Sequence, residues 1–129
     1  MPKFAVEQIT QFGTTIKVCK LYRDDQCKYD EFRAEIKDTN LESELGDLYA
    51  IIRKAANKES LPKTKFRKLK LSKKLSYAGY EAKSDNLRLY LFIDGDFIMV
   101  LGGKKGDQSQ DIDVLEKTIK EYTEFIKKK

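Results

Sequence analysis

Two apolar runs separated by an Asp-Gly pair organise the second half of the chain. The runs cover Leu89–Ile93 and Phe97–Leu101, with Asp94 and Gly95 between them. Asp-Gly between hydrophobic runs is a strong hairpin signal, because a type I′ turn needs positive φ at both central positions. The pattern therefore predicts a β-hairpin with a two-residue turn at Asp94-Gly95.

Such a turn would set the register of the hairpin, with Phe92 opposite Phe97 and Tyr90 opposite Met99. One face would then be purely aliphatic, with Leu87, Leu89, Leu91, Ile93, Ile98 and Val100. The other face is also mostly apolar, so we expect the hairpin to lie at the centre of a covered sheet. Arg88 is the exception on that second face. An unpaired buried guanidinium is costly, so Arg88 should reach a sheet edge, a cleft or a carboxylate.

The remaining elements follow from apolar periodicity. Alternating or β-branched patterns predict strands at Thr14–Tyr22 and Leu75–Lys83. Apolar residues at helical spacing predict helices at Lys28–Lys37, at Thr39–Asn57 and at Asp111–Lys127. Thr39 and Glu42 would form a capping box at the start of the second helix.

These elements predict an α+β fold. The expected order is strand, helix, helix, strand, strand, strand, helix, which gives a small, mainly antiparallel sheet with an N-terminal helix pair and a C-terminal helix. The pattern does not assign a secondary structure to residues 1–13. For the basic segment Lys63–Lys74 it does not distinguish a helix from a strand. We find no repeat or linker, so residues 1–129 are expected to form one domain.

Composition narrows the class of protein. The 129 residues are 36% charged and 40% hydrophobic, which is typical of a globular domain and not of a disordered one. No apolar run is long enough for a transmembrane helix, and the first residues do not resemble a signal peptide. Cys19 and Cys27 are the only cysteines, and we expect them to be reduced structural thiols in a cytoplasmic protein.

The chain contains no histidine, which restricts any chemistry that it performs. A nucleophile activated by histidine and a histidine general base are both excluded. With two cysteines and no histidine, a zinc site would lack ligands. Acid–base chemistry would have to come from a carboxylate, a lysine or a tyrosine.

The net charge of +5 is unevenly distributed along the chain. The segment Lys63–Lys74 has seven cations in twelve residues and no acidic residue: Lys63, Lys65, Arg67, Lys68, Lys70, Lys73 and Lys74. A patch of this kind suits a polyanion such as RNA or DNA. The alternative is an ordinary solvated basic stretch.

The residues around the hairpin resemble the RelE/ParE/HigB superfamily of bacterial toxins from type II toxin–antitoxin systems. The segment GYEAKSDNLRLY contains Tyr80, Lys83, Arg88 and Tyr90, and FIMVLGGKK ends in Lys104 and Lys105. In that family, a strand with tyrosine and lysine precedes a hydrophobic strand with an early arginine and tyrosine. A third strand then ends in glycine and a basic pair, and a terminal helix follows it.

The resemblance implies a metal-independent endoribonuclease that cleaves messenger RNA on the ribosome and is neutralised by an acidic antitoxin. The ribose 2′-OH would attack its own phosphate, while cations stabilise the charged transition state. The cations would be Arg88, Lys83 and Lys105. Because the chain has no histidine, Glu81 or a tyrosine, Tyr80 or Tyr90, would move the proton. Lys104 and the basic segment Lys63–Lys74 would bind the RNA backbone.

The chain departs from the nuclease pattern after its basic pair. Many nuclease members have a tyrosine or histidine there, whereas this chain reads Gly-Asp-Gln-Ser-Gln at 106–110. Two other functions therefore stay open: a ParE-like inhibitor that binds DNA gyrase, and a non-toxic basic module that binds RNA or protein. For Arg88 the alternative role is a structural ion pair, and for Lys104 and Lys105 it is a solvated loop.

Overall fold

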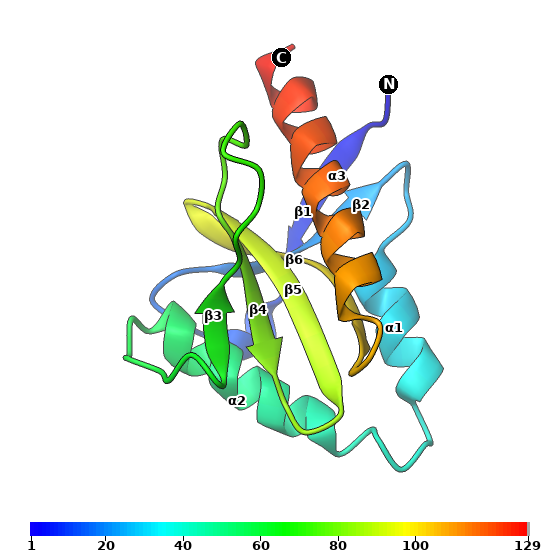
Figure 1. Ribbon diagram of the computed structural model, residues 1–129, viewed down its shortest axis with the longest axis vertical. Helices are drawn as coiled ribbons and strands as arrows, with labels where there is room; N and C mark the ends of the chain where they lie inside the picture. Colours follow the sequence, from blue (N-terminus) through cyan, green and yellow to red (C-terminus); the bar gives the residue numbers. More distant parts are fainter. Residues whose placement is uncertain (129) are drawn as a thin grey trace.

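The computed structural model describes residues 1–128 and contains one six-stranded sheet between two layers of helices (Figure 1). In space the strands follow the order β1-β2-β6-β5-β4-β3. Strands β2 and β6 are parallel, and every other neighbouring pair is antiparallel. The strand bounds are β1 Phe4–Gln8, β2 Val18–Arg23, β3 Phe66–Lys68, β4 Gly79–Lys83, β5 Leu87–Asp94 and β6 Asp96–Lys104.

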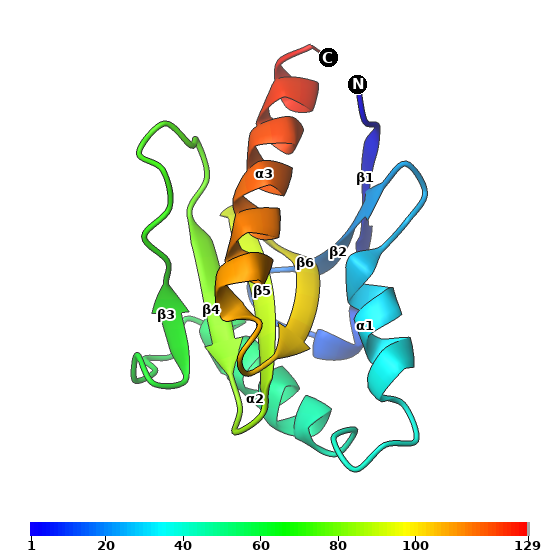
Figure 2. The same cartoon turned by 45° about the vertical axis from the view of Figure 1, so that its right-hand side comes forward.

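The helices divide between the two faces of the sheet (Figure 2). Helices α1 (Lys28–Ile36) and α2 (Glu44–Ala56) cover one face, while α3 (Gln108–Lys127) covers the other. A short 3₁₀ helix, η1 (Thr10–Phe12), follows β1. Each face has its own apolar core, because the side chains of β5 and β6 point alternately to the two helix layers. None of the helices in the described chain combines the length and apolarity needed to cross a membrane.

The α+β class is confirmed, but the predicted layout was wrong in the number and order of strands. The structure adds β1, from residues that the pattern did not assign, and β3, from within the basic segment. Both are edge strands that pair with one neighbour only, β1 with β2 and β3 with β4. An edge strand buries little of its own surface, so its local sequence has no clear alternation to reveal it.

The predicted hairpin is present, but its predicted turn and register were wrong. Asp94 pairs with Asp96 around Gly95, whose φ is +71°, so the turn is one residue tighter and Ile93 lies opposite Phe97. This shift places Phe97 and Met99 with the leucines of β5, under α1 and α2. A bulge then makes Val100 an extra residue in β6 and shifts the register again at Tyr90.

The predicted capping box was also wrong. Helix α2 begins at Glu44, and the Thr39 hydroxyl instead donates to the carbonyl of Ile36 (2.6 Å) at the end of α1. Glu44 has a different task, because its carboxylate accepts hydrogen bonds from the Asn86 backbone (2.9 Å) and from the hydroxyl of Ser84. The first turn of α2 is thereby tied to the β4–β5 turn.

The two cysteines are free and buried, as predicted for structural thiols. Cys19 lies in β2, and Cys27 lies just before α1. Burial raises the pKa of both thiols, which keeps them protonated and unreactive.

Gly102 allows α1 to approach the sheet closely, which generates the first testable prediction. A Cβ at Gly102 would overlap the ring of Phe32 on α1, whereas a Cβ at Gly46 in α2 would meet nothing within 4 Å. We expect Gly102→Ala to lower the free energy of unfolding by about 1–3 kcal/mol. The control Gly46→Ala should raise it by about 0.5–1 kcal/mol, since alanine favours the helix. Urea unfolding of both variants checks this, and a neutral Gly102→Ala would contradict the close packing.

Candidate functional site

Four of the five residues predicted to be catalytic lie in two neighbouring cross-strand pairs of β4 and β5. Glu81 lies opposite Tyr90, and Lys83 lies opposite Arg88. Residues two apart on a strand share a face, so all four occupy the face that α3 covers. Three further polar residues adjoin them, and we call the seven together the polar cluster: Arg67, Glu81, Lys83, Arg88, Tyr90, Gln108 and Asp111.

Glu81 is the best-connected member of the polar cluster and is fully buried. Arg67 Nε donates to one carboxylate oxygen (2.7 Å), and Gln108 Nε2 donates to the other (2.9 Å). Burial by itself raises the pKa of Glu81, but the bonds from Gln108 and Arg67 outweigh it and lower that pKa below its ordinary value. Glu81 is therefore ionised near neutral pH, and its oxygens hold β3 and α3 onto β4.

Arg88 is 5% exposed and has no carboxylate partner within 4 Å among residues 1–128. Its Nη1 donates to the backbone carbonyls of Ser84 (2.6 Å) and Leu87 (2.9 Å). The ion pair considered from the sequence is thus replaced by carbonyl contacts. Arg88 Nε is buried and has no hydrogen-bond partner in the described chain.

Tyr90 is fully buried beside Glu81, and its hydroxyl makes no hydrogen bond of good geometry within the described chain. Burial raises the pKa of this phenol strongly, and the negative charge of Glu81 raises it further. Tyr90 is therefore a neutral phenol. It can donate a proton, but it cannot act as a base.

Two members of the polar cluster, Gln108 and Asp111, were not predicted from the sequence. Asp111 lies in the first turn of α3. Its Oδ2 is buried without a hydrogen-bond partner in the described chain, and it lies against Gly103, where a Cβ would collide with it. Burial and the nearby charge of Asp107 raise the pKa of Asp111 to about 6. The sequence could have indicated that Asp111 faces the sheet. It is four residues before the buried Leu115, so it lies on the apolar stripe of α3.

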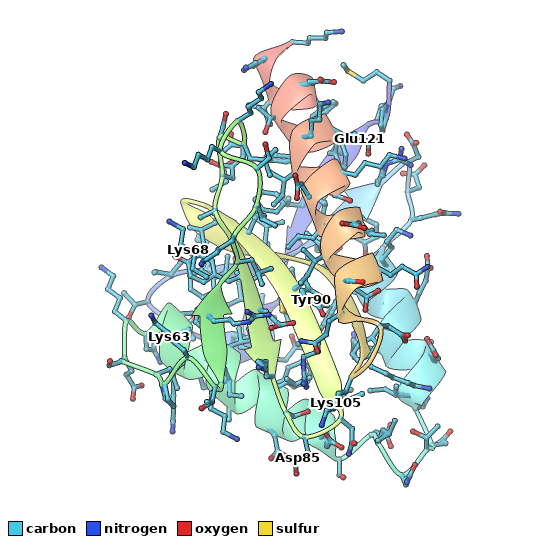
Figure 3. All side chains as sticks on the ribbon, in the orientation of Figure 1. Lys63, Lys68, Asp85, Tyr90, Lys105 and Glu121 are labelled. Atoms are coloured by element: carbon cyan, nitrogen blue, oxygen red, sulfur yellow. The ribbon has the colours of Figure 1, made fainter. Side chains whose placement is uncertain are left out.

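The two lysines at the end of β6, Lys104 and Lys105, lie apart from each other and are not part of the polar cluster. Lys104 forms an ion pair with Glu35 on α1 (3.7 Å), which turns it toward the opposite face. Lys105 is exposed in the loop before α3, and its backbone amide donates to the carbonyl of Asn86 (2.8 Å). Figure 3 accordingly shows Lys105 near Asp85 of the β4–β5 turn, below Tyr90.

The basic segment forms an open hollow beside β3, which we call the basic hollow. It has a volume of about 650 Å³, and its lining consists of Lys63, Arg67, Lys68, Leu69, Lys70 and Ile112. Figure 3 shows Lys63 and Lys68 on this side of the molecule, toward the β3 edge. The other predicted RNA contacts, Lys65, Lys73 and Lys74, are exposed but lie outside its lining.

Arg67 connects the basic hollow to the polar cluster. Its side chain is 40% exposed in the hollow, while its Nε is bonded to the buried Glu81. A guanidinium has five N–H donors, so the hydrogen bond to Glu81 leaves further donors for a ligand in the hollow. An anion bound in the hollow would therefore act on the same side chain that balances Glu81.

Comparisons with known proteins identify no relative: no protein-family model, no curated protein and no solved structure matches this chain. Within residues 1–128, no group of three or more cysteine, aspartate or glutamate side chains is placed to hold a metal ion. The function has to be inferred from the polar cluster and the basic hollow themselves.

The buried charge of Glu81 generates the second prediction. Arg67→Ala would leave this carboxylate buried with only Gln108 as its partner, so we expect the free energy of unfolding to fall by about 2 kcal/mol. Lys68→Ala removes a cation from the next position of the same strand, where the side chain is exposed, and should change stability by less than about 0.5 kcal/mol. Urea unfolding of both variants gives the comparison, and equal effects would show that the ion pair does not stabilise the fold.

The raised pKa of Asp111 generates the third prediction. Its ordinary pKa is 3.8 and its folded pKa is about 6, so the unfolded chain loses this proton first as the pH rises. As the pH rises from about 4 to about 6, the ionisation of Asp111 should therefore lower the free energy of unfolding. Asp111→Asn should be more stable than the wild type at about pH 8 and similar to it at about pH 4.

Asp113→Asn is the control for this effect, because it removes the same charge from an exposed position two residues along α3. Thermal unfolding at both pH values compares the two variants with the wild type. If Asp111→Asn and Asp113→Asn had the same pH dependence of stability, burial of Asp111 would not be its cause.

Proposed function

We propose that this chain is a RelE/HigB-like toxin that cleaves messenger RNA without a metal ion. The observation that carries the proposal is the position of Lys83, Arg88, Glu81 and Tyr90 in adjacent pairs on one face of the sheet. Arg67 joins this cluster to an open hollow rich in lysine. Cations beside a site of phosphoryl transfer and a basic track for the backbone are what RNA cleavage requires.

The architecture supports the same proposal. When the edge strands β1 and β3 are set aside, the remaining elements follow the order strand, helix, helix, strand, strand, strand, helix. The strands that remain are neighbours in the order β2-β6-β5-β4, with β2 parallel to β6. The order of these elements along the chain is the one that the resemblance to the toxin superfamily implies.

The chemistry assigned to each residue follows from its environment. Arg88 and Lys83 would stabilise the negative charge that develops when the ribose 2′-OH passes its proton to a solvent water molecule and attacks the adjacent phosphorus. Tyr90, as a neutral phenol, would donate a proton to the departing 5′-oxygen. Glu81 is not a proton carrier in this scheme, because both of its oxygens are held by Arg67 and Gln108. It holds the pair of strands and α3 in place.

Access to the cluster requires a movement of the first turn of α3. Arg88 is 5% exposed and Tyr90 is fully buried, so a scissile phosphate reaches them only when Gln108 and Asp111 move away. Lys105, in the loop directly before α3, would then lie at the entrance. Binding energy from the basic hollow would offset the cost of this opening, since both regions share Arg67.

The predicted partners fit the open part of the surface. Messenger RNA on the ribosome would follow the basic hollow, and an acidic antitoxin would cover the same cations and exclude RNA by charge complementarity. The affinity of both partners should therefore fall with salt.

The closed cluster favours a second candidate, a non-catalytic function on the same fold. A protein whose Arg88 binds only backbone carbonyls would use the exposed lysines alone, either to bind RNA without cleavage or to bind a protein target in the manner of ParE on gyrase. In both of these candidates the RNA stays intact, whereas the nuclease cleaves it.

Induced expression of wild type and variants, with growth curves and primer extension on an abundant transcript, tests the proposal. Lys83→Ala and Arg88→Lys should each reduce the appearance of new 5′ ends by about a hundredfold, as expected for loss of a group that stabilises the transition state. Lys54→Ala, an exposed position on α2, is the control and should cleave like the wild type. Circular dichroism of the purified variants excludes unfolding as the cause.

Each outcome assigns a different function. New 5′ ends that disappear in Lys83→Ala and Arg88→Lys support the nuclease. Growth arrest without RNA cleavage supports the ParE-like inhibitor, and the absence of both, in a folded protein, supports the binding module.

A further inference from the structure

A second hollow lies on the opposite side of the sheet from the polar cluster, where β1 and η1 meet α1 and α2. It has a volume of about 420 Å³. Its floor and walls include three aromatic rings and three cations: Phe12, Tyr29, Tyr49, Lys20, Arg33 and Arg53. The aromatic side chains belong to the core under α1 and α2, so the hollow is separated from α3 by the sheet. We call it the arginine hollow.

The two arginines of this hollow are held in place by aromatic rings. The guanidinium of Arg33 on α1 lies 5.5 Å from the centre of the Tyr29 ring, and that of Arg53 on α2 lies 5.6 Å from the centre of the Phe12 ring. Both rings are buried, so they are fixed supports. A guanidinium held in this way loses less rotamer freedom when it binds a ligand.

The charge around the hollow is incompletely balanced. Arg53 has no carboxylate within 4 Å in the described part of the chain, and Arg33 has only a 3.4 Å contact with Asp30. Lys20 is the best-paired cation, with Asp30 at 2.9 Å and Glu7 at 3.5 Å. Glu7 is the only acid among the lining residues, and Asp30 lies beside Lys20 and Arg33, so three cations and two acids leave a local charge of +1.

The tyrosines add a neutral hydrogen-bond donor. The hydroxyl groups of Tyr29 and Tyr49 lie 2.8 Å apart, so one donates to the other. Two hydroxyl groups with one hydrogen bond between them retain one O–H that can donate to a ligand. Because burial and this hydrogen bond raise the pKa of Tyr29, it remains a phenol at neutral pH.

We propose that the arginine hollow binds a phosphate monoester, with Arg33 and Arg53 holding the phosphoryl oxygens and the tyrosine pair beside them. A phosphate monoester has a charge of about −1.5 to −2 at neutral pH, which is opposite in sign to the net charge around the hollow. Arginine binds phosphate oxygens through two parallel N–H bonds. The volume falls within the roughly 300–1,000 Å³ of small-molecule sites, so an organic group attached to the phosphate also fits.

The phosphate monoester has two sources, a free nucleotide or the 5′-phosphate end of an RNA. The inference does not rest on the proposed nuclease activity, because none of its residues belongs to the polar cluster or the basic hollow.

Isothermal titration calorimetry with the full chain tests the site, using uridine monophosphate, inorganic phosphate and uridine as probes. Uridine monophosphate should bind more tightly than inorganic phosphate, and uridine should not bind. Arg33→Gln and Arg53→Gln should each weaken the binding of uridine monophosphate by at least about tenfold. Lys54→Gln is the matched control, because it removes the same charge from an exposed neighbour of Arg53 that does not line the hollow.

Several results would overturn the proposal. One is an equal loss of binding in Lys54→Gln, which would indicate diffuse charge attraction. Another is displacement of uridine monophosphate by equimolar benzoate, which would indicate a carboxylate site. Absence of phosphate binding by the folded wild type is the third.

A pair of short RNAs, with 5′-phosphate and with 5′-hydroxyl ends, distinguishes the two sources. They are compared in a variant with Lys63, Lys68 and Lys70 changed to glutamine, so that the basic hollow keeps only the charge of Arg67, which Glu81 pairs. Preference for the 5′-phosphate RNA over uridine monophosphate, lost in Arg53→Gln, identifies an RNA end as the ligand. Equal or weaker binding of that RNA identifies the free nucleotide.

Discussion

The buried charge of Glu81 is the interaction on which the α3-covered face of the sheet depends. A carboxylate without solvent needs a countercharge and hydrogen-bond donors, and these come from Arg67 on β3 and Gln108 at the start of α3. The edge strand β3, its neighbour β4 and the C-terminal helix are thus joined at one point. In the ion pair with Glu81, Arg67 is the residue that also lines the basic hollow.

The geometry of the hairpin decides what lies beside Glu81. The tight turn at Gly95 and the bulge at Val100 together set Tyr90 opposite Leu101, with Gly103 opposite Arg88. Gly103 has no side chain, and this lets the Asp111 carboxylate lie against the sheet. The result is a closed group of polar side chains with buried atoms that lack partners in the described chain, and the proposed opening of this group would give them partners.

The two faces of the sheet differ in how they present cations. On the α3 side, Arg88 is enclosed and the lysines of the basic hollow are exposed. On the α1 and α2 side, Arg33 and Arg53 are fixed over Tyr29 and Phe12 at the rim of a hollow. Flexible lysines suit a long polyanion with no fixed register, whereas fixed guanidinium groups suit one defined phosphate. The proposals for the two sites follow from this difference.

The sequence alone determined the α+β class, the positions of the three helices, the central hairpin and the residues that cluster on β4 and β5. These features depend on local periodicity, and side-chain alternation puts Glu81 and Lys83 on one face of β4, as it does Arg88 and Tyr90 on β5. Arg88 was recognised because a cation in an apolar strand is exceptional, wherever the strand lies.

Only the tertiary structure decided the edge strands, the hairpin register, the partners of Glu81 and the arginine hollow. Each of these joins segments far apart in the chain, such as Arg67 with Gln108 or Arg33 with Phe12. A one-residue change in a turn exchanges the two faces of a strand, and no local pattern records it. The balance of a buried charge likewise depends on which helix covers it, and that is settled only when the chain has folded.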